Sequence, residues 1–441
     1  MDVPDVHYAR SGDVAIAYQV VGEGPTDLVF LPFLSNLWWL WRYPHFEPFA
    51  NRLAESRRLV LVNTRGMGLS DRPRGITIEA RMDDILAVLD ALAIERCALL
   101  GIGEAAATCI LFAGSYPERV ERLIVFTPFA RGTASEDYPW APTREQWLES
   151  FRVERERWGE RGYLEELAHI LNPQWADEAG YIEHFVWFHR HSASPGAVLE
   201  FRRLQMESDV TDVLPAVRVP TLVLTKEHQR GPSQYVADRI PDARLVELPG
   251  EGMAIHEHDG VHAADAIEAF LRGGIPAEVP DSVLATILFT DLVGSTEHAT
   301  EVGDRAWRDL LARHHALVRR ELARFRGEER DTAGDGFFAT FDGPARAIRA
   351  AQAIVGGVRE LGLEIRAGVH TGECELHDAK VAGIAVSIGA RLAAAAPPSE
   401  VLVSSTVKDL VAGSGIEFEE RGVHELKGVP GEWRLYAVSP S

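Results

Sequence analysis

A stretch rich in glycine and proline divides this chain of 441 residues into two unequal parts. Residues 272–282 read RGGIPAEVPDS and follow an apolar segment that ends at Leu271, and this composition is typical of a linker. A chain of this length is long enough for two or three domains. We therefore expect a first domain over residues 1–272, a linker over 273–282 and a second domain over 283–441.

The first of these domains alternates short apolar segments with stretches typical of helices. Strands that are continuously apolar and separated by helices usually lie in a parallel sheet that is covered on both faces. The alternation stops at about residues 132–210, where a helix-prone stretch rich in Trp, Glu and Arg predicts a lid inserted on the sheet. We therefore expect an α/β domain with a mostly parallel sheet and a helical lid. The apolar segments occupy residues 27–32, 58–63, 97–101, 123–126, 221–225 and 244–248.

The second domain begins with another α/β pattern. Residues 284–290 form an apolar strand segment, and residues 299–325 carry apolar side chains at the spacing of one amphipathic helix. The chain therefore predicts two separate α/β cores, one on each side of the linker.

The charge balance bears on the kind of partner that the chain can bind. Lys and Arg number 45 and Asp and Glu number 66, which leaves a formal net charge of -21. A protein that binds nucleic acid by neutralising phosphates needs the opposite balance, so we predict no nucleic-acid partner. Binding of a small anionic substrate is still compatible with this charge, provided that a local basic site or bound cations reverse the negative electrostatic field of the protein.

Cysteine usage and the first residues indicate a soluble cytoplasmic protein. Cys97, Cys109 and Cys374 are widely spaced and show no CxxC or Cys/His metal pattern, which excludes a disulfide framework and a zinc module. We expect three inert thiols in the core. The polar opening MDVPDVHYARSGD lacks the basic and apolar regions of a signal peptide. Since no run approaches 18 apolar residues, we also expect no membrane span.

Three segments of the first domain resemble the α/β-hydrolase family. They are VNTRGMGLSDRP at residues 62–73, LLGIGEAAATCILFAGSYPERVERLIV at 99–125 and VPTLVL at 219–224. The resemblance covers roughly residues 8–272 and implies the fold of that family. In the family, a GxSxG turn between a strand and a helix holds the catalytic nucleophile.

The residues that match the catalytic triad of this family lack its chemistry. The GxSxG turn is replaced by GIGEA at residues 101–105, so that Gly103 stands at the position of the nucleophile. Met253 stands at the position of the histidine, and only Glu227 lies near the position of the acid. We therefore predict a domain that does not hydrolyse substrates. The alternative is a rewired catalytic site that uses Glu104 or His256. We favour the interpretation that these two residues are solvated, in a loop and at a helix end.

Such a domain can still bind a ligand. The turn and the lid can enclose a pocket for a small apolar molecule, and Trp38, Trp39 and Trp41 could line it. The alternative, which we favour slightly, is that these aromatic residues pack against the lid or at a subunit interface.

Several motifs after the linker resemble, in the same order, the catalytic domain of class III nucleotidyl cyclases. The resemblance runs from Leu284 to Val438, about a third of the chain, and implies an α+β ferredoxin-like fold. It also implies a nucleotide cyclase in which the hydrolase-like domain is regulatory. The motifs are ATILFTDLVGST at residues 285–296, DTAGDGFFATF at 331–341, GIAVSIGARLA at 383–393 and ELKGVPGEWRLY at 425–436.

Two aspartates in these motifs suit a pair of divalent cations, Mg²⁺ or Mn²⁺. Asp291 ends an apolar strand beside the free amides of a helix start, which suits a metal-bridged triphosphate. Asp335 lies between two glycines, which free the backbone for a hairpin turn that sets it against Asp291. Either aspartate alone is more typical of a cap or a turn. Together, in this order, they predict the two-metal site of the family, with the backbone of Leu292 as a further ligand.

The other site residues follow from the resemblance. Arg391 matches the arginine that stabilises charge on the α-phosphate, and Ser387 stands where the family has asparagine. Serine can donate one hydrogen bond, so we expect weakened catalysis. The resemblance assigns binding of the triphosphate to Gly294, Ser295, Thr296 and Lys427.

The residues that select the purine base depart from the family pattern. Members that use ATP have lysine and aspartate at the positions of Asp331 and Lys380, so the two charges are exchanged here. The exchanged pair still holds one donor and one acceptor for adenine, and it could partly satisfy guanine. We favour ATP, and a guanylate cyclase or a scaffold without catalysis stays open.

In this family each active site forms across two subunits. The chain carries both sets of residues, which implies a homodimer with up to two composite sites. Two hypotheses of other classes remain: a serine-type esterase with a passenger cyclase domain, and a binding protein in which both halves are degenerate.

Overall fold

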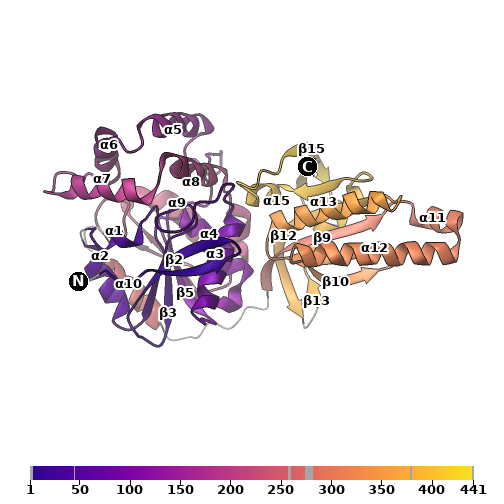
Figure 1. The fold of residues 1–441 in the computed structure, drawn as a ribbon, viewed down its shortest axis with the longest axis horizontal. Helices are drawn as coiled ribbons and strands as arrows, with labels where there is room; N and C mark the ends of the chain where they lie inside the picture. Colours follow the sequence, from indigo (N-terminus) through magenta and orange to yellow (C-terminus); the bar gives the residue numbers. More distant parts are fainter. Residues whose placement is uncertain (1–2, 44, 257–259, 274–281, 378–379, 440–441) are drawn as a thin grey trace. The chain divides into compact units, whose positions relative to one another are not determined.

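A computed structural model describes residues 3–43, 45–256, 260–273, 282–377 and 380–439. The chain forms two compact units, Met1–Pro280 and Asp281–Ser441 (Figure 1). Most of the linker expected over 273–282 lies outside the described residues. Among the described residues no helix is both long enough and apolar enough to cross a membrane.

An eight-stranded sheet forms the centre of the first unit, in the order β1-β2-β4-β3-β5-β6-β7-β8. β1 and β2 pair antiparallel, and all neighbours from β4 to β8 pair parallel, so the mostly parallel sheet is confirmed. β8 is an edge strand and is largely exposed, unlike the buried strands beside it. The bounds are β1 His7–Ser11, β2 Val14–Val21, β3 Asp27–Leu31, β4 Arg58–Val62, β5 Cys97–Ile102, β6 Val120–Phe126, β7 Thr221–Thr225 and β8 Arg244–Glu247.

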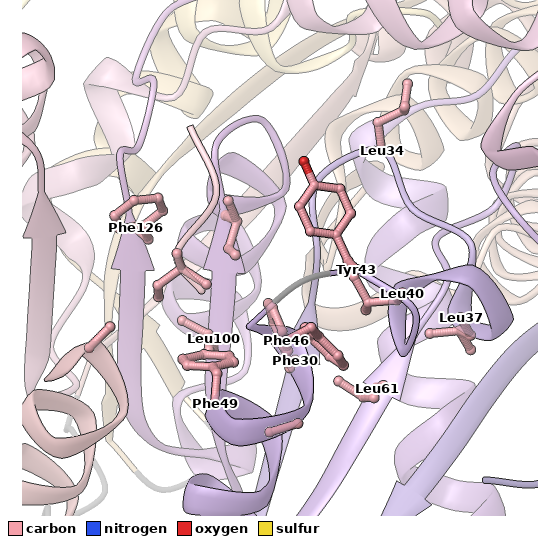
Figure 2. Packing of buried hydrophobic residues seen from close by; sticks show 14 of the residues in the cluster. Phe30, Leu34, Leu37, Leu40, Tyr43, Phe46, Phe49, Leu61, Leu100 and Phe126 are labelled. Atoms are coloured by element: carbon pink, nitrogen blue, oxygen red, sulfur yellow. The ribbon is translucent and has the colours of Figure 1, made fainter. Parts of the chain in front are cut away.

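Helices pack on this sheet and enclose an aromatic core. Figure 2 shows Phe30 of β3 next to Phe46 and Phe49 of α2, with Leu61 of β4 and Leu100 of β5 close by. All five side chains are buried. The helices are α1 Leu37–Leu40, α2 Phe46–Ala54, α3 Ile78–Ala91, α4 Ala105–Ser115, α9 Arg230–Ala237 and α10 Gly260–Arg272.

Helices also fill the interval between β6 and β7, where the lid is expected. Phe185 and Phe201 from these helices are buried in the same cluster as the sheet residues, so the lid shares the core of the first unit. The helices are α5 Arg144–Arg157, α6 Arg161–Leu171, α7 Tyr181–Ser192 and α8 Pro195–Glu207.

The second unit is built on a βαββαβ arrangement. Its first four strands pair in the order β10-β11-β9-β12, which is the ferredoxin-like topology implied by the resemblance. The sheet continues through β14, β16 and β15, and β13 pairs with β12. The bounds are β9 Ser282–Leu292, β10 Glu328–Ala333, β11 Gly336–Phe341, β12 Ile365–His377, β13 Lys380–Ala382, β14 Val401–Ser404, β15 Phe418–Glu425 and β16 Glu432–Val438.

The helix expected over residues 299–325 is divided into two. Gly303, at φ 77°, ends one helix and precedes the next, a conformation that favours glycine over other residues. The longer helix packs with the following one on the main core of this unit. The bounds are α11 Ser295–Val302, α12 Asp304–Arg324, α13 Pro344–Glu360, α14 Ile384–Ala395 and α15 Ser405–Leu410.

The three cysteines are buried free thiols, as predicted. Burial raises the pKa of Cys97 and of Cys374 to about 12, so both are protonated at neutral pH.

Candidate functional site

The strand register brings the two aspartates of the second unit to the same place. In the antiparallel pair of β9 and β11, Thr290 lies opposite Phe337. The turn that contains Asp335 therefore lies next to Asp291, one residue beyond this pair. Gly334 in that turn has φ 67°, which explains why glycine precedes the aspartate.

Two histidines of α12 hold the Asp335 turn. His314 Nε2 donates to the carbonyl of Asp335 at 3.2 Å, and His315 Nε2 donates to the carbonyl of Gly334 at 3.0 Å. Burial lowers the pKa of His314, which therefore acts as a neutral donor. Sequence reasoning missed both histidines, since the amphipathic pattern of α12 does not show which residues meet a turn 20 positions away.

The Asp335 carboxylate fits a cation. Its Oδ2 atom is buried and has no hydrogen-bond partner among the described residues. A buried carboxylate oxygen without a donor is costly, and a bound cation removes that cost. In the described part of the chain, no three His, Cys, Asp or Glu side chains are grouped as a metal site. The remaining ligands would be waters, backbone oxygens or phosphates of a nucleotide, since Mg²⁺ usually combines one or two carboxylates with waters and substrate phosphates.

Asp291 already has a cationic neighbour in the chain. Arg366 lies opposite it on β12, and its Nε and Nη2 atoms donate to Asp291 Oδ2 at 3.0 and 2.6 Å. Both side chains are partly exposed, so this ion pair contributes little to stability. Its effect is to fix the position of the Asp291 carboxylate. Sequence reasoning missed Arg366, because only the pairing of β9 with β12 makes the two residues neighbours.

The segment that is predicted to bind phosphate lies between β9 and α11. Leu292 is the buried last residue of β9, and Gly294 has φ 66° at the start of α11. The first amides of a helix such as α11, which begins at Ser295, are suited to an anion. The side chain of Thr296 lies outside the described residues.

Arg391, Ser387 and Lys427 form a second group of residues. Ser387 and Arg391 lie one turn apart on α14 and are exposed, and Arg391 Nε donates to the carbonyl of Lys427 at 2.9 Å. Within the described residues, no hydrogen bond or ion pair joins any of these three to Asp291 or Asp335.

The structure does not bring the two expected base-selecting residues together. Asp331 is exposed on β10, an edge strand of the second sheet. Its Oδ1 atom accepts a hydrogen bond from the backbone amide of Thr332 at 2.9 Å. Lys380 begins β13, opposite His377 of β12. The side chain of Lys380 lies outside the described residues.

In the first unit, the turn that would carry a nucleophile keeps its backbone shape. Gly103 directly follows β5 and has φ 58°. It lies two residues before Ala105, the first residue of α4. A Cβ atom at this position would lie 3.1 Å from the ring of Phe33. Met253 is half-buried and supplies no base. The unit therefore keeps a turn between a strand and a helix. The positions that match the nucleophile and the histidine of the family carry Gly103 and Met253 instead.

The expectation that Glu104 and His256 are solvated is wrong. Glu104 is buried and forms an ion pair with Arg81, which is itself fully buried. This pairing accounts for its burial, because a buried charge needs a partner. His256 is buried among aromatic rings. Glu227 is exposed after β7.

A cavity of about 350 Å³ lies inside the first unit. Met253 and His256 line it, whereas Trp38, Trp39 and Trp41 are not among its lining residues. Trp39 instead stacks on Trp187 of α7, with ring centroids 5.9 Å apart. Trp39 therefore packs against the lid, whereas Trp41 packs on Phe46 of α2 and donates to Gln19 of β2.

Replacing Gly103 by serine should not create an esterase. The side chain would be strained at positive φ, which costs about 1 kcal/mol or more, and no base stands at Met253. We expect neither the wild type nor Gly103→Ser to hydrolyse a p-nitrophenyl ester or to react with a fluorophosphonate probe. The double variant Gly103→Ser/Met253→His is the matched comparison, because only this variant carries both a nucleophile and a base at these two positions. Labelling of the wild type would instead support the serine-type esterase.

Comparison with known proteins identifies both units. A sequence model of the adenylate and guanylate cyclase catalytic domain matches residues 277–440, and one of the α/β hydrolase fold matches residues 28–184. The chain is 27% identical over 166 residues to "Putative adenylate cyclase 3" of Rhizobium meliloti, a match that covers 36% of this chain and 28% of that protein. It is 31% identical over 121 residues to 2-(acetamidomethylene)succinate hydrolase of Mesorhizobium japonicum, covering 27% of this chain and 41% of that protein.

These matches cover only parts of the relatives, and the chain spans less than half the length of each of these two proteins. Among solved structures, an esterase from Exiguobacterium antarcticum superposes with a TM-score of 0.53 at 20% identity, over 61% of this chain and 100% of that one. At this identity the match supports the fold of the first unit. The chain therefore joins a domain of the α/β-hydrolase fold to an adenylate and guanylate cyclase catalytic domain.

Proposed function

We propose that the second unit converts ATP into 3′,5′-cyclic AMP and pyrophosphate, with two divalent cations at a site formed between two copies of the chain. The observation that carries this proposal is the buried Asp335 Oδ2, which has no hydrogen-bond partner in the described part of the chain and lies in a turn next to Asp291. Both aspartates lie in the segment that matches the cyclase family. The hydrolase-like unit is proposed to be regulatory.

The residues of the chain divide the chemistry between them. Asp291 and Asp335 would hold Mg²⁺ or Mn²⁺, with the backbone of Leu292 as a further ligand. Such cations lower the pKa of the ribose 3′-hydroxyl and neutralise the triphosphate. The amides at the start of α11 donate to phosphate oxygens, together with Gly294, Ser295 and Thr296.

The second group of residues acts on the α-phosphate. The guanidinium of Arg391 stabilises the negative charge that develops there, and the ammonium of Lys427 binds the triphosphate. Ser387 donates one hydrogen bond in place of the usual asparagine amide. Since a serine side chain is shorter than that of asparagine, slower turnover is expected than with asparagine at this position.

A homodimer explains why the two groups of residues are separate in one chain. The aspartates are held by Arg366 and by the histidines of α12, whereas Arg391 bonds to the backbone at Lys427. Family sites combine such groups from two subunits, and this chain carries both.

An assay with purified full-length protein tests the proposal and the choice of base. The protein is incubated with Mn²⁺ or Mg²⁺ and either ATP or GTP, and the cyclic product is measured. We expect more cyclic AMP than cyclic GMP, because a relative of this chain carries the name "Putative adenylate cyclase 3". Asp331 and Lys380 lie apart in the structure, so they would meet adenine from opposite walls, Asp331 as the acceptor and Lys380 as the donor. More cyclic GMP would make the protein a guanylate cyclase. Nucleotide binding without turnover would identify a scaffold.

Replacing His315 by alanine should weaken metal use without removing it. The Asp335 turn loses one of its two side-chain hydrogen bonds, and one such bond is worth about 1 kcal/mol, or roughly fivefold. We expect the Mn²⁺ concentration for half-maximal activity to rise by about this factor. Arg319→Ala is the control, since Arg319 lies on the same helix as His315 but pairs with Glu329 of β10 and not with the turn. An equal rise in both variants would contradict a specific role for His315.

A further inference from the structure

The cavity of the first unit is a chamber that aromatic side chains and residues of the lid helices line. Tyr43 and Phe46, both labelled in Figure 2, line it on one side, and Phe185 and Phe188 of α7 line it on another. A volume of about 350 Å³ lies within the range of small-molecule sites, which are mostly apolar with a few polar groups.

One polar atom in this chamber has no hydrogen-bond partner among the residues that the structure describes. His256 is 7% exposed, lines the cavity, and its Nε2 atom has no hydrogen-bond partner among the described residues. Its ring packs edge-on against Tyr43 and Phe46, with centroid distances of 5.0 and 5.3 Å. Burial lowers the pKa of His256 to about 3, so the ring is neutral at pH 7. An unsatisfied buried nitrogen is costly, and a polar atom of a ligand would satisfy it.

The two arginines that line the chamber are already neutralised. Arg131 Nε pairs with Asp209 at 2.7 Å, and Arg202 Nε pairs with the buried Glu154 at 3.0 Å. An anionic ligand would have to break one of these ion pairs and leave a buried carboxylate alone. The chamber therefore favours a neutral ligand.

We propose that this chamber binds a neutral, largely apolar small molecule through one hydrogen bond between its hydroxyl or carbonyl oxygen and His256 Nε2. The molecule is bound and released unchanged, because Gly103 and Met253 supply neither a nucleophile nor a base. This proposal does not rest on cyclase activity, and its test needs no nucleotide.

A matched pair of probes tests the proposal, 2-naphthol and naphthalene, which differ by one hydroxyl group. A hydroxyl can donate or accept, so it suits either neutral tautomer of His256. Binding to the full-length protein is measured by fluorescence titration. We expect the wild type to bind 2-naphthol about tenfold more tightly than naphthalene, as one buried hydrogen bond predicts.

Four variants decide where this preference arises. His256→Phe keeps a ring and removes the nitrogen, so it should lose the preference for 2-naphthol and bind naphthalene at least as tightly, because the hydroxyl is then buried without a partner. His256→Gln keeps a hydrogen-bonding side chain and should retain part of the preference. Ala254→Trp fills the cavity at its lining and should abolish binding of both probes, whereas His191→Phe, outside the lining residues, should change nothing. Thermal unfolding shows whether each variant is folded.

Three outcomes would overturn the proposal. They are the absence of saturable 2-naphthol binding to the wild type, an unchanged preference in His256→Phe, and full binding to folded Ala254→Trp. Loss of the preference in His256→Gln as well as in His256→Phe would also count against a hydrogen bond at Nε2.

Discussion

Replacing Asp335 by alanine should reduce cyclic nucleotide formation by a factor on the order of 10³, which is typical when a main charge-stabilising group is removed. The variant loses the buried Oδ2 that fits a cation. The whole chain carries a formal net charge of -21, so a triphosphate binds only where cations and basic side chains reverse the local field. Without the cation site, Arg391 and Lys427 remain as the basic groups proposed for the nucleotide.

Two further variants separate the loss of charge from a loss of folding. Asp335→Asn keeps the shape of the side chain and should be nearly as inactive as Asp335→Ala, because a neutral amide lacks the negative charge that a carboxylate offers to these cations. Asp342→Asn is the control outside the site, where Asp342 pairs with Arg346 at 2.6 Å, and it should stay within about twofold of the wild type. Activity is measured as cyclic product over a range of Mn²⁺ concentrations. Substantial activity in folded Asp335→Ala would contradict the role of this residue.

The sheet of the first unit could be predicted from the sequence, because strands that are buried on both faces consist of continuous apolar segments. β5 and β7 are buried along their whole length, and their neighbours pair parallel. β8 shows the limit of this signal, since Arg244–Glu247 is mostly exposed as an edge strand. The prediction of one helix over residues 299–325 was wrong, because the chain breaks into two helices at Gly303. The amphipathic spacing of apolar residues continues across this break and does not reveal it.

Burial of single polar residues could not be predicted in the same way. Glu104 is buried because Arg81, more than 20 positions earlier in the chain, forms an ion pair with it. Likewise Arg366 reaches Asp291 only through the register of β9 with β12. Such partners depend on three-dimensional packing, which a local pattern does not contain. The turn at Asp335 and the strand end at Asp291 could be predicted, since glycines and the end of an apolar segment mark them in the sequence.

Mixing two inactive variants, Asp291→Ala and Arg391→Ala, should restore activity if each site uses residues from two subunits. A mixed dimer then has one site with both lesions and one site with neither, so one site in that dimer is intact. Random pairing of equal amounts makes half of the dimers mixed, and each has one of two sites, so we expect about a quarter of wild-type activity. Each variant alone should fall by a factor of at least about 10², as for loss of a preorganised charged group.

The mixture distinguishes a shared site from a site within one chain, because in a single-chain site every copy carries a lesion. Equal amounts of the two variants are unfolded and refolded together, or coexpressed, so that subunits exchange before cyclic product is measured. The Asp291→Ala/Arg391→Ala double variant mixed with wild type is the matched control. In the shared-site arrangement its mixed dimers have a lesion in each site, so the mixture should show about a quarter of the activity of an equal total of wild-type chains, which comes from wild-type dimers alone. Failure of the two single variants to rescue each other, with both folded and dimeric, would contradict the shared site.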